Sequence, residues 1–246
     1  MSDAGAPSLV PVLGRPRMHL RVTDSTNARA HELAGRGAPH GMLVTAGMQT
    51  AGRGRQGRTW SAPPGRALLC SLIVRRPPPL LSLAAGVAVA EVAAALAGET
   101  RTAAVKWPND VLLDGRKLAG ILVEGRPQED WAVVGIGLNV ALHPADLPPD
   151  VQATAATLGL GTEAIEPTLS RLLHELGHWL AAPANMVLDA VRARDALRGQ
   201  TVRWAGGQGR AIGIDEHGRL QIHTGQGTTA LDAGEVHLLD EAAASP

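Results

Sequence analysis

Residues 105–124 read Val-Lys-Trp-Pro-Asn-Asp-Val-Leu-Leu-Asp-Gly-Arg-Lys-Leu-Ala-Gly-Ile-Leu-Val-Glu. Two apolar segments, 105–113 and 117–124, flank the dipeptide Asp114-Gly115, which is typical of a tight hairpin turn. The same stretch carries both lysines of the chain, Lys106 and Lys117, among 23 basic residues. Because arginine is the usual cation of this protein, two lysines so close together indicate that a compact ammonium group is needed here.

Strands and helices are expected on both sides of this hairpin, followed by a different pattern near the C-terminus. We expect strands at 18–22, 42–46, 67–74 and 131–140, and helices at 28–33, 82–97, 168–182 and 185–198. After Gln200 come five short segments with glycine turns, at 201–204, 210–214, 220–223, 228–231 and 236–239. This order predicts an α+β domain followed by a small β-barrel. We divide the chain into an N-terminal extension (1–17), a large domain (18–198) and the barrel (199–246).

Composition indicates a folded, soluble protein. Of the 246 residues, 45% are hydrophobic and 19% charged, and the net charge is zero, so the chain has no general attraction to nucleic acid or membranes. Prolines interrupt residues 1–17, where a secretory segment would lie, and the longest apolar stretch, 80–98, reads as an alanine-rich helix rather than a membrane span. Cys70 is the sole cysteine and lies in an apolar run, which favours a core position in a reducing cytoplasm.

A glycine-rich loop at 52–57, Gly-Arg-Gly-Arg-Gln-Gly, matches the dinucleotide fingerprint but lacks its context. The fingerprint requires a helix to begin at the loop, whereas residues 58–65 contain two prolines. Arg75 and Arg76 stand where an acidic residue should bind ribose. The loop instead presents guanidinium groups suited to carboxylate or phosphate, on Arg53, Arg55 and Arg58. A basic surface or an RNA-binding element is the alternative, but the apolar strands on both sides favour a structured loop over a ligand.

The motif Lys-Trp-Pro-Asn-Asp at 106–110 carries further candidate ligand groups. Lys106 can meet a phosphate, Asn109 can donate and accept hydrogen bonds, and Asp110 offers a hard oxygen to a metal ion. The same residues also form turns readily, so a purely structural turn is the alternative. Lys117 opens an apolar strand, where an inward-pointing ammonium requires an anionic partner.

Together these motifs resemble the biotin–protein ligases. The resemblance runs from about residue 18 to the C-terminus and rests on five segments in the family's order. They are Ser25-Thr-Asn27, Gln49 with Gly52–Arg58 and Trp60, Lys106–Asp110, Lys117–Glu124, and Gly135-Ile-Gly-Leu-Asn139. The resemblance implies a catalytic domain related to class II aminoacyl-tRNA synthetases and lipoate ligases, with a small SH3-like C-terminal barrel.

The family's reaction, by resemblance, has two steps. ATP with Mg²⁺ and biotin form biotinyl-5′-adenylate and pyrophosphate, and a lysine of a biotin carboxyl carrier domain then takes the biotinyl group and releases AMP. Such chemistry needs fixed cations rather than a protein nucleophile. The implied partners are therefore biotin, ATP and the carrier domain of a biotin-dependent carboxylase, and the protein could also form a homodimer.

The resemblance also implies a role for individual residues. Lys117 is the first catalytic candidate, with Arg53 and Arg55. The implied biotin-binding residues are Ser25, Thr26, Asn27, Gln49, Arg53, Gly54, Arg55 and Lys117. The implied ATP-binding residues are Arg53, Arg55, Arg58, Lys106, Asn109, Asp110 and Asn139, with Asp110 as the metal ligand. Trp60 and Trp107 could line the pocket or belong to the core.

Two departures from the family pattern affect these expectations. Some relatives carry an N-terminal winged-helix domain, and the few residues before Ser25 predict no such domain and no DNA binding. Some relatives also cover adenine with a tryptophan near the segment that corresponds to 154–158, which contains no aromatic residue here.

Three alternative functions match parts of the sequence. His174-Glu-Leu-Gly-His178 fits the zinc peptidase motif, but alanines occupy positions 181 and 184, where an extended motif would have Gly and His. A lipoate-type acyl ligase on the same fold is the second alternative, and the Gly-Arg loop with Lys106–Asp110 argues against it. An RNA-binding module is the third.

Overall fold

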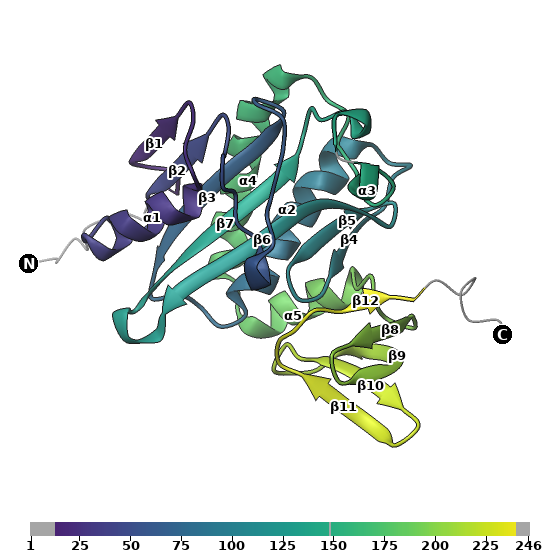
Figure 1. Cartoon of the computed structure of the whole chain (residues 1–246). Helices are drawn as coiled ribbons and strands as arrows, with labels where there is room; N and C mark the ends of the chain where they lie inside the picture. Colours follow the sequence, from purple (N-terminus) through teal and green to yellow (C-terminus); the bar gives the residue numbers. More distant parts are fainter. Residues whose placement is uncertain (1–12, 148, 240–246) are drawn as a thin grey trace, which may run out of the picture.

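The computed structural model describes residues 13–147 and 149–239. A seven-stranded sheet forms its larger part, and a second, five-stranded sheet lies beside it (Figure 1). The large sheet has the order β1-β2-β3-β7-β6-β5-β4; β1 and β2 are parallel, and the other neighbours are antiparallel. Its strands are β1 Arg17–Leu20, β2 Leu43–Ala46, β3 Ala67–Arg75, β4 Ala103–Lys106, β5 Asp110–Leu113, β6 Arg116–Arg126 and β7 Trp131–Asn139.

Helices cover both faces of the large sheet. The α-helices of the described ranges are α1 Thr26–Gly35, α2 Leu81–Ala97, α3 Pro149–Gln152, α4 Ile165–Ala181 and α5 Ala184–Ala193. Side chains alternate along β3, so Cys70 and Leu72 join the core with α2 and α4, whereas Ile73 packs in the smaller core beneath α1. The near-continuous apolar run of β3 therefore results from burial on both faces.

The expected strands and helices are present, with a few corrected bounds. The strand expected over 105–113 is two strands, because residues 107–109 form a turn that pairs Lys106 with Asp110. Pro108 lies in this turn, where its missing N–H interrupts no ladder. The helix expected over 185–198 ends at Ala193, because the following backbone pairs with β4 through Val105 N to Arg194 O (2.8 Å) and Ala196 N to Val105 O (3.0 Å).

The C-terminal segment forms a five-stranded antiparallel sheet, consistent with the small SH3-like domain that we expected. Its strands are β8 Thr201–Trp204, β9 Gly207–Ile214, β10 Leu220–Thr224, β11 Gly227–Leu231 and β12 His237–Leu238, in the order β11-β10-β9-β8-β12. Strand β12 has two residues and pairs with β8. Within residues 201–239 the two outer strands, β11 and β12, do not pair with each other, so the sheet stays open.

Contacts attach this sheet to the rest of the protein. The indole Nε1 of Trp107 donates to the carbonyl of Gly218 at 2.9 Å, and the guanidinium of Arg192 on α5 donates to the carbonyl of Ile214. Trp107 is 3% exposed, so one residue of the turn after β4 lies within the core shared by both parts.

Two predictions from composition are tested by this fold. Cys70 is 2% exposed and belongs to the core, as expected. Across residues 13–147 and 149–239, none of the helices has the length and apolarity needed to cross a membrane.

Candidate active site

A pocket of about 470 Å³ opens on the α1 side of the large sheet. Its wall includes every residue that the sequence analysis assigned to a site: Ser25, Thr26, Asn27, Gln49, Arg53, Gly54, Arg55, Arg58, Lys106, Asn109, Asp110, Lys117 and Asn139. These residues come from segments more than 100 positions apart in the chain, and the sheet brings them together. A cavity of this size suits a small-molecule substrate.

One end of the pocket is a network of uncharged polar groups at the start of α1. Ser25 caps the helix, its hydroxyl accepting from the Ala28 amide at 3.4 Å. The side-chain oxygen Oε1 of Gln49 accepts from the backbone N–H of Thr26 (2.7 Å) and from its hydroxyl (3.0 Å). Ser71, fully buried on β3, lies 2.8 Å from the Thr26 hydroxyl and 2.6 Å from Oδ1 of Asn27. Since most of their partners are fixed, these side chains present a rigid polar surface.

Glycines on β7 form the floor of the pocket. A Cβ atom at Gly135 would lie 2.0 Å from Oδ1 of Asn27, and one at Gly137 would lie 2.4 Å from the indole ring of Trp60. A side chain at either position would therefore displace a residue of the pocket wall. Trp60 lies against the sheet and lines the pocket, as one of the two interpretations of this residue predicted.

The arginine-rich loop is folded back on itself over this floor. The Gly54 amide donates to the Arg58 carbonyl (2.7 Å), the Trp60 amide donates to the Gly52 carbonyl (3.0 Å), and residues 55–57 form a short 3₁₀ turn. The structured loop that the flanking strands predicted is thus present, and it forms one wall of the pocket.

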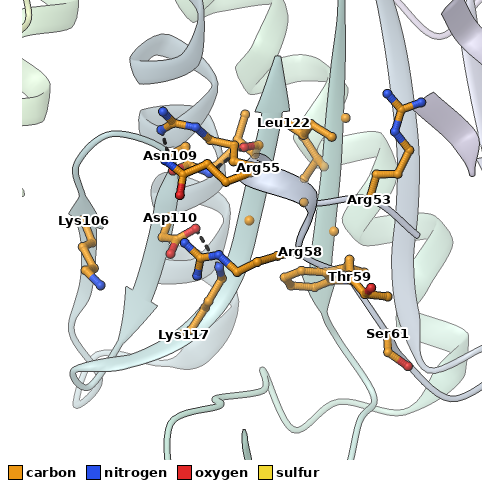
Figure 2. A pocket seen from close by; sticks show the side chains of 18 of the residues that line it. Arg53, Arg55, Arg58, Thr59, Ser61, Lys106, Asn109, Asp110, Lys117 and Leu122 are labelled. Atoms are coloured by element: carbon orange, nitrogen blue, oxygen red, sulfur yellow. Dashed lines mark hydrogen bonds and ion pairs between the residues drawn. The ribbon is translucent and has the colours of Figure 1, made fainter. Parts of the chain in front are cut away.

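The three arginines of this loop point in different directions (Figure 2). Arg55 donates to the side-chain oxygen of Asn109 at 3.2 Å, and Arg58 reaches an ion pair with Glu235 of the C-terminal segment. Arg53 points away from the group formed by Arg55, Asp110 and Lys117 and makes an ion pair with Glu124 on β6.

Lys117 projects into the centre of the pocket. Its Nζ lies 2.8 Å from Oδ1 of Asp110 and 5.8 Å from the centre of the Trp60 ring. Two hydrogen bonds fix the backbone of Lys117: its N–H donates to the carbonyl of Thr154, and its C=O accepts from the amide of Ala156. The anionic partner that an inward lysine requires is therefore Asp110, on the neighbouring strand.

Comparison with known proteins agrees with this geometry. The Biotin/lipoate A/B protein ligase family profile matches residues 19–140, and the Biotin protein ligase C terminal domain profile matches residues 190–239. The Biotin--[acetyl-CoA-carboxylase] ligase of Mycobacterium tuberculosis is 39% identical over 231 residues, which cover 87% of this chain and 85% of the relative. The Bifunctional ligase/repressor BirA of Bacillus subtilis is 34% identical over 248 residues, covering 92% of this chain and 75% of that protein. The chain belongs to the biotin protein ligase family.

A solved structure extends the similarity to three dimensions. The ligase resembles the biotin protein ligase from Aquifex aeolicus in complex with biotin and ATP, with a TM-score of 0.75 and 27% sequence identity. The match covers 92% of this chain and 99% of the other. The likeness therefore includes the C-terminal sheet as well as the large one.

Lys106, at the end of β4, is partly buried in the pocket wall. Burial lowers the pKa of Lys106 below its ordinary value of 10.5; the charge of Asp110 opposes this shift and the ammonium of Lys117 adds to it. Because burial disfavours the charged form of Lys106, its ammonium group is suited to bind an anion such as phosphate.

The C-terminal segment supplies part of the pocket that the sequence analysis did not anticipate. Gly234, Glu235 and Val236 line it, and Glu235 faces Arg58 of the loop. No motif marked these residues, since their role follows from a contact across more than 170 positions of the chain. Leu147, Val151 and Ala155 add an apolar wall near Asn139, whose amide donates to the Ala156 carbonyl at 2.9 Å.

The zinc peptidase alternative gains no support from the structure. His174 and His178 lie on the exposed side of α4 and are not part of the pocket wall. Within the described ranges, no group of three or more His, Cys, Asp or Glu side chains is placed to hold a metal ion.

Proposed function

We propose that this ligase joins biotin to ATP as biotinyl-5′-adenylate and then transfers the biotinyl group to a lysine of a biotin carboxyl carrier domain. One observation carries the proposal: a single pocket has an uncharged polar end at Ser25–Asn27 and a cationic centre at Lys117 and the arginine loop. A neutral heterocyclic head suits the first, and a carboxylate beside a phosphate suits the second.

We assign the polar end to the ureido ring of biotin. Thr26, Asn27 and Gln49 lie there in fixed hydrogen bonds, and the glycines of the floor let Asn27 and Trp60 pack directly against β7. The valeryl chain of biotin would then run along Trp60 toward Lys117, which lies 5.8 Å from that ring. This direction brings the carboxylate of biotin to the ammonium group at the centre of the pocket.

We assign the first chemical step to the cationic centre. A carboxylate oxygen of biotin attacks the α-phosphorus of ATP, the bond from that phosphorus to the β-phosphate bridging oxygen breaks, and pyrophosphate leaves. Lys117, Arg55 and Arg53 would hold the two anions together and stabilise the charge that grows on phosphorus. Arg58, Lys106, Asn109 and Asn139 would bind the nucleotide, and Leu147 and Val151 would pack on adenine in place of an aromatic ring.

The residues present fit a Mg²⁺ ion that arrives with ATP. Asp110 and Glu235 are the carboxylates of the described pocket wall, and Mg²⁺ in nucleotide sites commonly takes one or two carboxylates together with phosphate oxygens and water. Asp110 is the better placed, since it lies beside the centre at Lys117. When bound, the ion would neutralise phosphate charge.

The second step needs no nucleophile from the ligase. The ε-amine of the carrier lysine attacks the acyl carbon of the adenylate, the bond from this carbon to the phosphate oxygen breaks, and AMP leaves as the amine loses a proton. Consistent with this step, neither histidine nor cysteine occurs in the described part of the pocket wall.

The test is pyrophosphate release by the purified ligase with ATP and either biotin or lipoate. We expect release with biotin and none above background with lipoate, followed by labelling of a carrier domain when it is added. Equal release with lipoate would favour the lipoate-type alternative, and no release with either acid would contradict the proposal.

A further inference from the structure

Glu124 lies outside the pocket but contacts two residues that line it. Its Oε2 accepts a hydrogen bond from Nδ2 of Asn27 at 2.9 Å, and its Oε1 forms the ion pair with Arg53. The side chain is 26% exposed and lines a second hollow, which the arginine loop borders as well. One carboxylate therefore connects the polar end of the pocket with the loop that covers its cationic centre.

The contact with Glu124 is one of three that orient the Asn27 amide, together with the Leu122 carbonyl at Nδ2 and the Ser71 hydroxyl, which lies 2.6 Å from Oδ1. Both hydrogens of Nδ2 have acceptors on β6, one at Glu124 and the other at the carbonyl of Leu122 (3.3 Å). Turning the amide over would place its oxygen against the carboxylate, with two acceptors opposed in a site where Asn27 is 3% exposed. The carbonyl oxygen is therefore held over Gly135, on the floor of the pocket.

An amide oxygen held in this way selects among substrates. It accepts a hydrogen bond, so it favours a head group that offers an N–H, as the ureido ring of biotin does, over a ring without a donor, as in lipoate. We propose that Glu124 is a positioning residue that sets this preference by orienting Asn27. The inference rests on the proposed function, because it takes the Asn27 end of the pocket as the place of the biotin ring.

The pairing with Arg53 makes Glu124→Gln an informative variant. A carboxylate accepts at both oxygens, whereas an amide of the same shape accepts at one end and donates at the other. If the oxygen of the new glutamine stays with Arg53, its NH₂ group faces the NH₂ group of Asn27. Two opposed donors would work against the present orientation of the Asn27 amide, which only the Leu122 carbonyl and the Ser71 hydroxyl would still support, so its oxygen would be held less firmly toward the pocket.

The first experiment measures pyrophosphate release by Glu124→Gln at varied biotin and varied ATP. We expect the KM for biotin to rise about tenfold, the effect of one misdirected hydrogen bond, while kcat and the KM for ATP stay within about twofold. Discrimination between biotin and an analogue methylated on its ureido nitrogens should fall by a similar factor. A residue that only stabilised the fold would not produce this difference between biotin and ATP.

Glu91→Gln is the matched control. Glu91 also accepts from two donors on different elements, Trp179 (2.8 Å) and Arg194 (3.0 Å), and it is 27% exposed, but it is not part of the pocket wall. This variant should melt at a lower temperature and keep the wild-type KM for biotin. Both variants are first melted, and the assays are run below the lower of their two melting temperatures.

A second comparison uses Arg53→Gln as the background. Without the guanidinium at position 53, the side-chain oxygen introduced by Glu124→Gln is free to accept from Asn27 again. Adding Glu124→Gln to Arg53→Gln should therefore change the KM for biotin by less than about twofold. An undiminished effect in this background would contradict the orientation argument.

The outcomes separate this inference from the proposed function. A wild-type enzyme that releases no pyrophosphate with biotin would contradict the function itself. An active wild type in which Glu124→Gln leaves the KM for biotin within about twofold, or changes kcat and both KM values together, would overturn the role of Glu124 alone.

Discussion

Lys117 and Asp110 form an ion pair in the centre of the pocket, with Nζ and Oδ1 2.8 Å apart. We assign the ammonium of Lys117 to the biotin carboxylate and the carboxylate of Asp110 to Mg²⁺. The ion pair must therefore break when biotin and MgATP bind. The lysine side chain is 38% exposed, and an ion pair this accessible contributes about 1 kcal/mol or less. The pair is therefore weak enough to exchange, and it keeps both charges satisfied until substrates bind.

Lys117→Ala should abolish most adenylate formation while the protein stays folded. The variant loses the ammonium that stabilises charge at the reacting carboxylate and phosphate, and we expect kcat to fall by about 100-fold or more. Pyrophosphate release measures the rate, and circular dichroism checks the fold. Lys117→Arg is the matched variant: the charge remains, but a planar fork replaces the compact ammonium, so only partial recovery is expected. Normal release by Lys117→Ala would remove its central role.

Asp110→Asn should increase the Mg²⁺ concentration that the reaction needs. A neutral amide oxygen binds Mg²⁺ more weakly than a carboxylate does, so the half-saturating concentration should rise several-fold. A magnesium titration at fixed ATP and biotin measures the effect. Asp114→Asn is the control, because Asp114 pairs with Arg101 at 2.7 Å outside the pocket. Identical titrations for the two variants would argue against Asp110 as a ligand.

Arg55→Gly should weaken retention of the adenylate more than its formation. The change removes a guanidinium and its contact with Asn109 and makes the loop more flexible. We expect the adenylate to escape and to label lysines of added unrelated proteins, which a streptavidin blot detects. Arg76→Gly serves as control, since Arg76 is exposed and has a φ of 49°, a conformation that glycine adopts readily. Labelling confined to the carrier domain would contradict this expectation.

Trp107→Phe should destabilise the protein by leaving the Gly218 carbonyl without its indole donor. The loss of one partner of a buried hydrogen bond costs about 1–3 kcal/mol, and the smaller ring removes packing as well. Chemical denaturation measures the loss in the free energy of unfolding. Trp204→Phe, on strand β8 and only partly buried, should cost less. Equal losses would show that the hydrogen bond between the two sheets contributes little.

Cys70 should resist thiol reagents in the native protein. Burial raises the pKa of its thiol from 9.0 to about 12, and the thiolate is the reactive form. The unfolded chain ionises near 9.0 while the native chain stays neutral, so the unfolding free energy should fall as pH rises above 9.0. Ellman's reagent at about pH 8, with and without denaturant, measures the difference. Fast modification without denaturant would show that the β3 core opens readily.

Local patterns explain why much of the fold could be predicted. The hairpin at Asp114-Gly115, the apolar strand β3 and the alanine-rich helix α2 are each encoded by neighbouring residues, and all are present. The bound that needed the largest correction depended on a distant partner. Helix α5 ends at Ala193 because the next residues pair with β4.

By itself, the sequence determined which residues we assign to the chemistry. The candidate motifs contain both lysines, the arginine-rich loop and three of the four asparagines. The charged side chains suit anionic ligands and the amides suit polar ones, and this follows from residue chemistry alone. Only the tertiary structure decided how they are paired. Asp110 faces Lys117, Glu124 joins Asn27 to Arg53, and Glu235 reaches Arg58 from the C-terminal segment. Such pairings depend on strand order and on the packing of one sheet beside another, which no local pattern of the chain specifies.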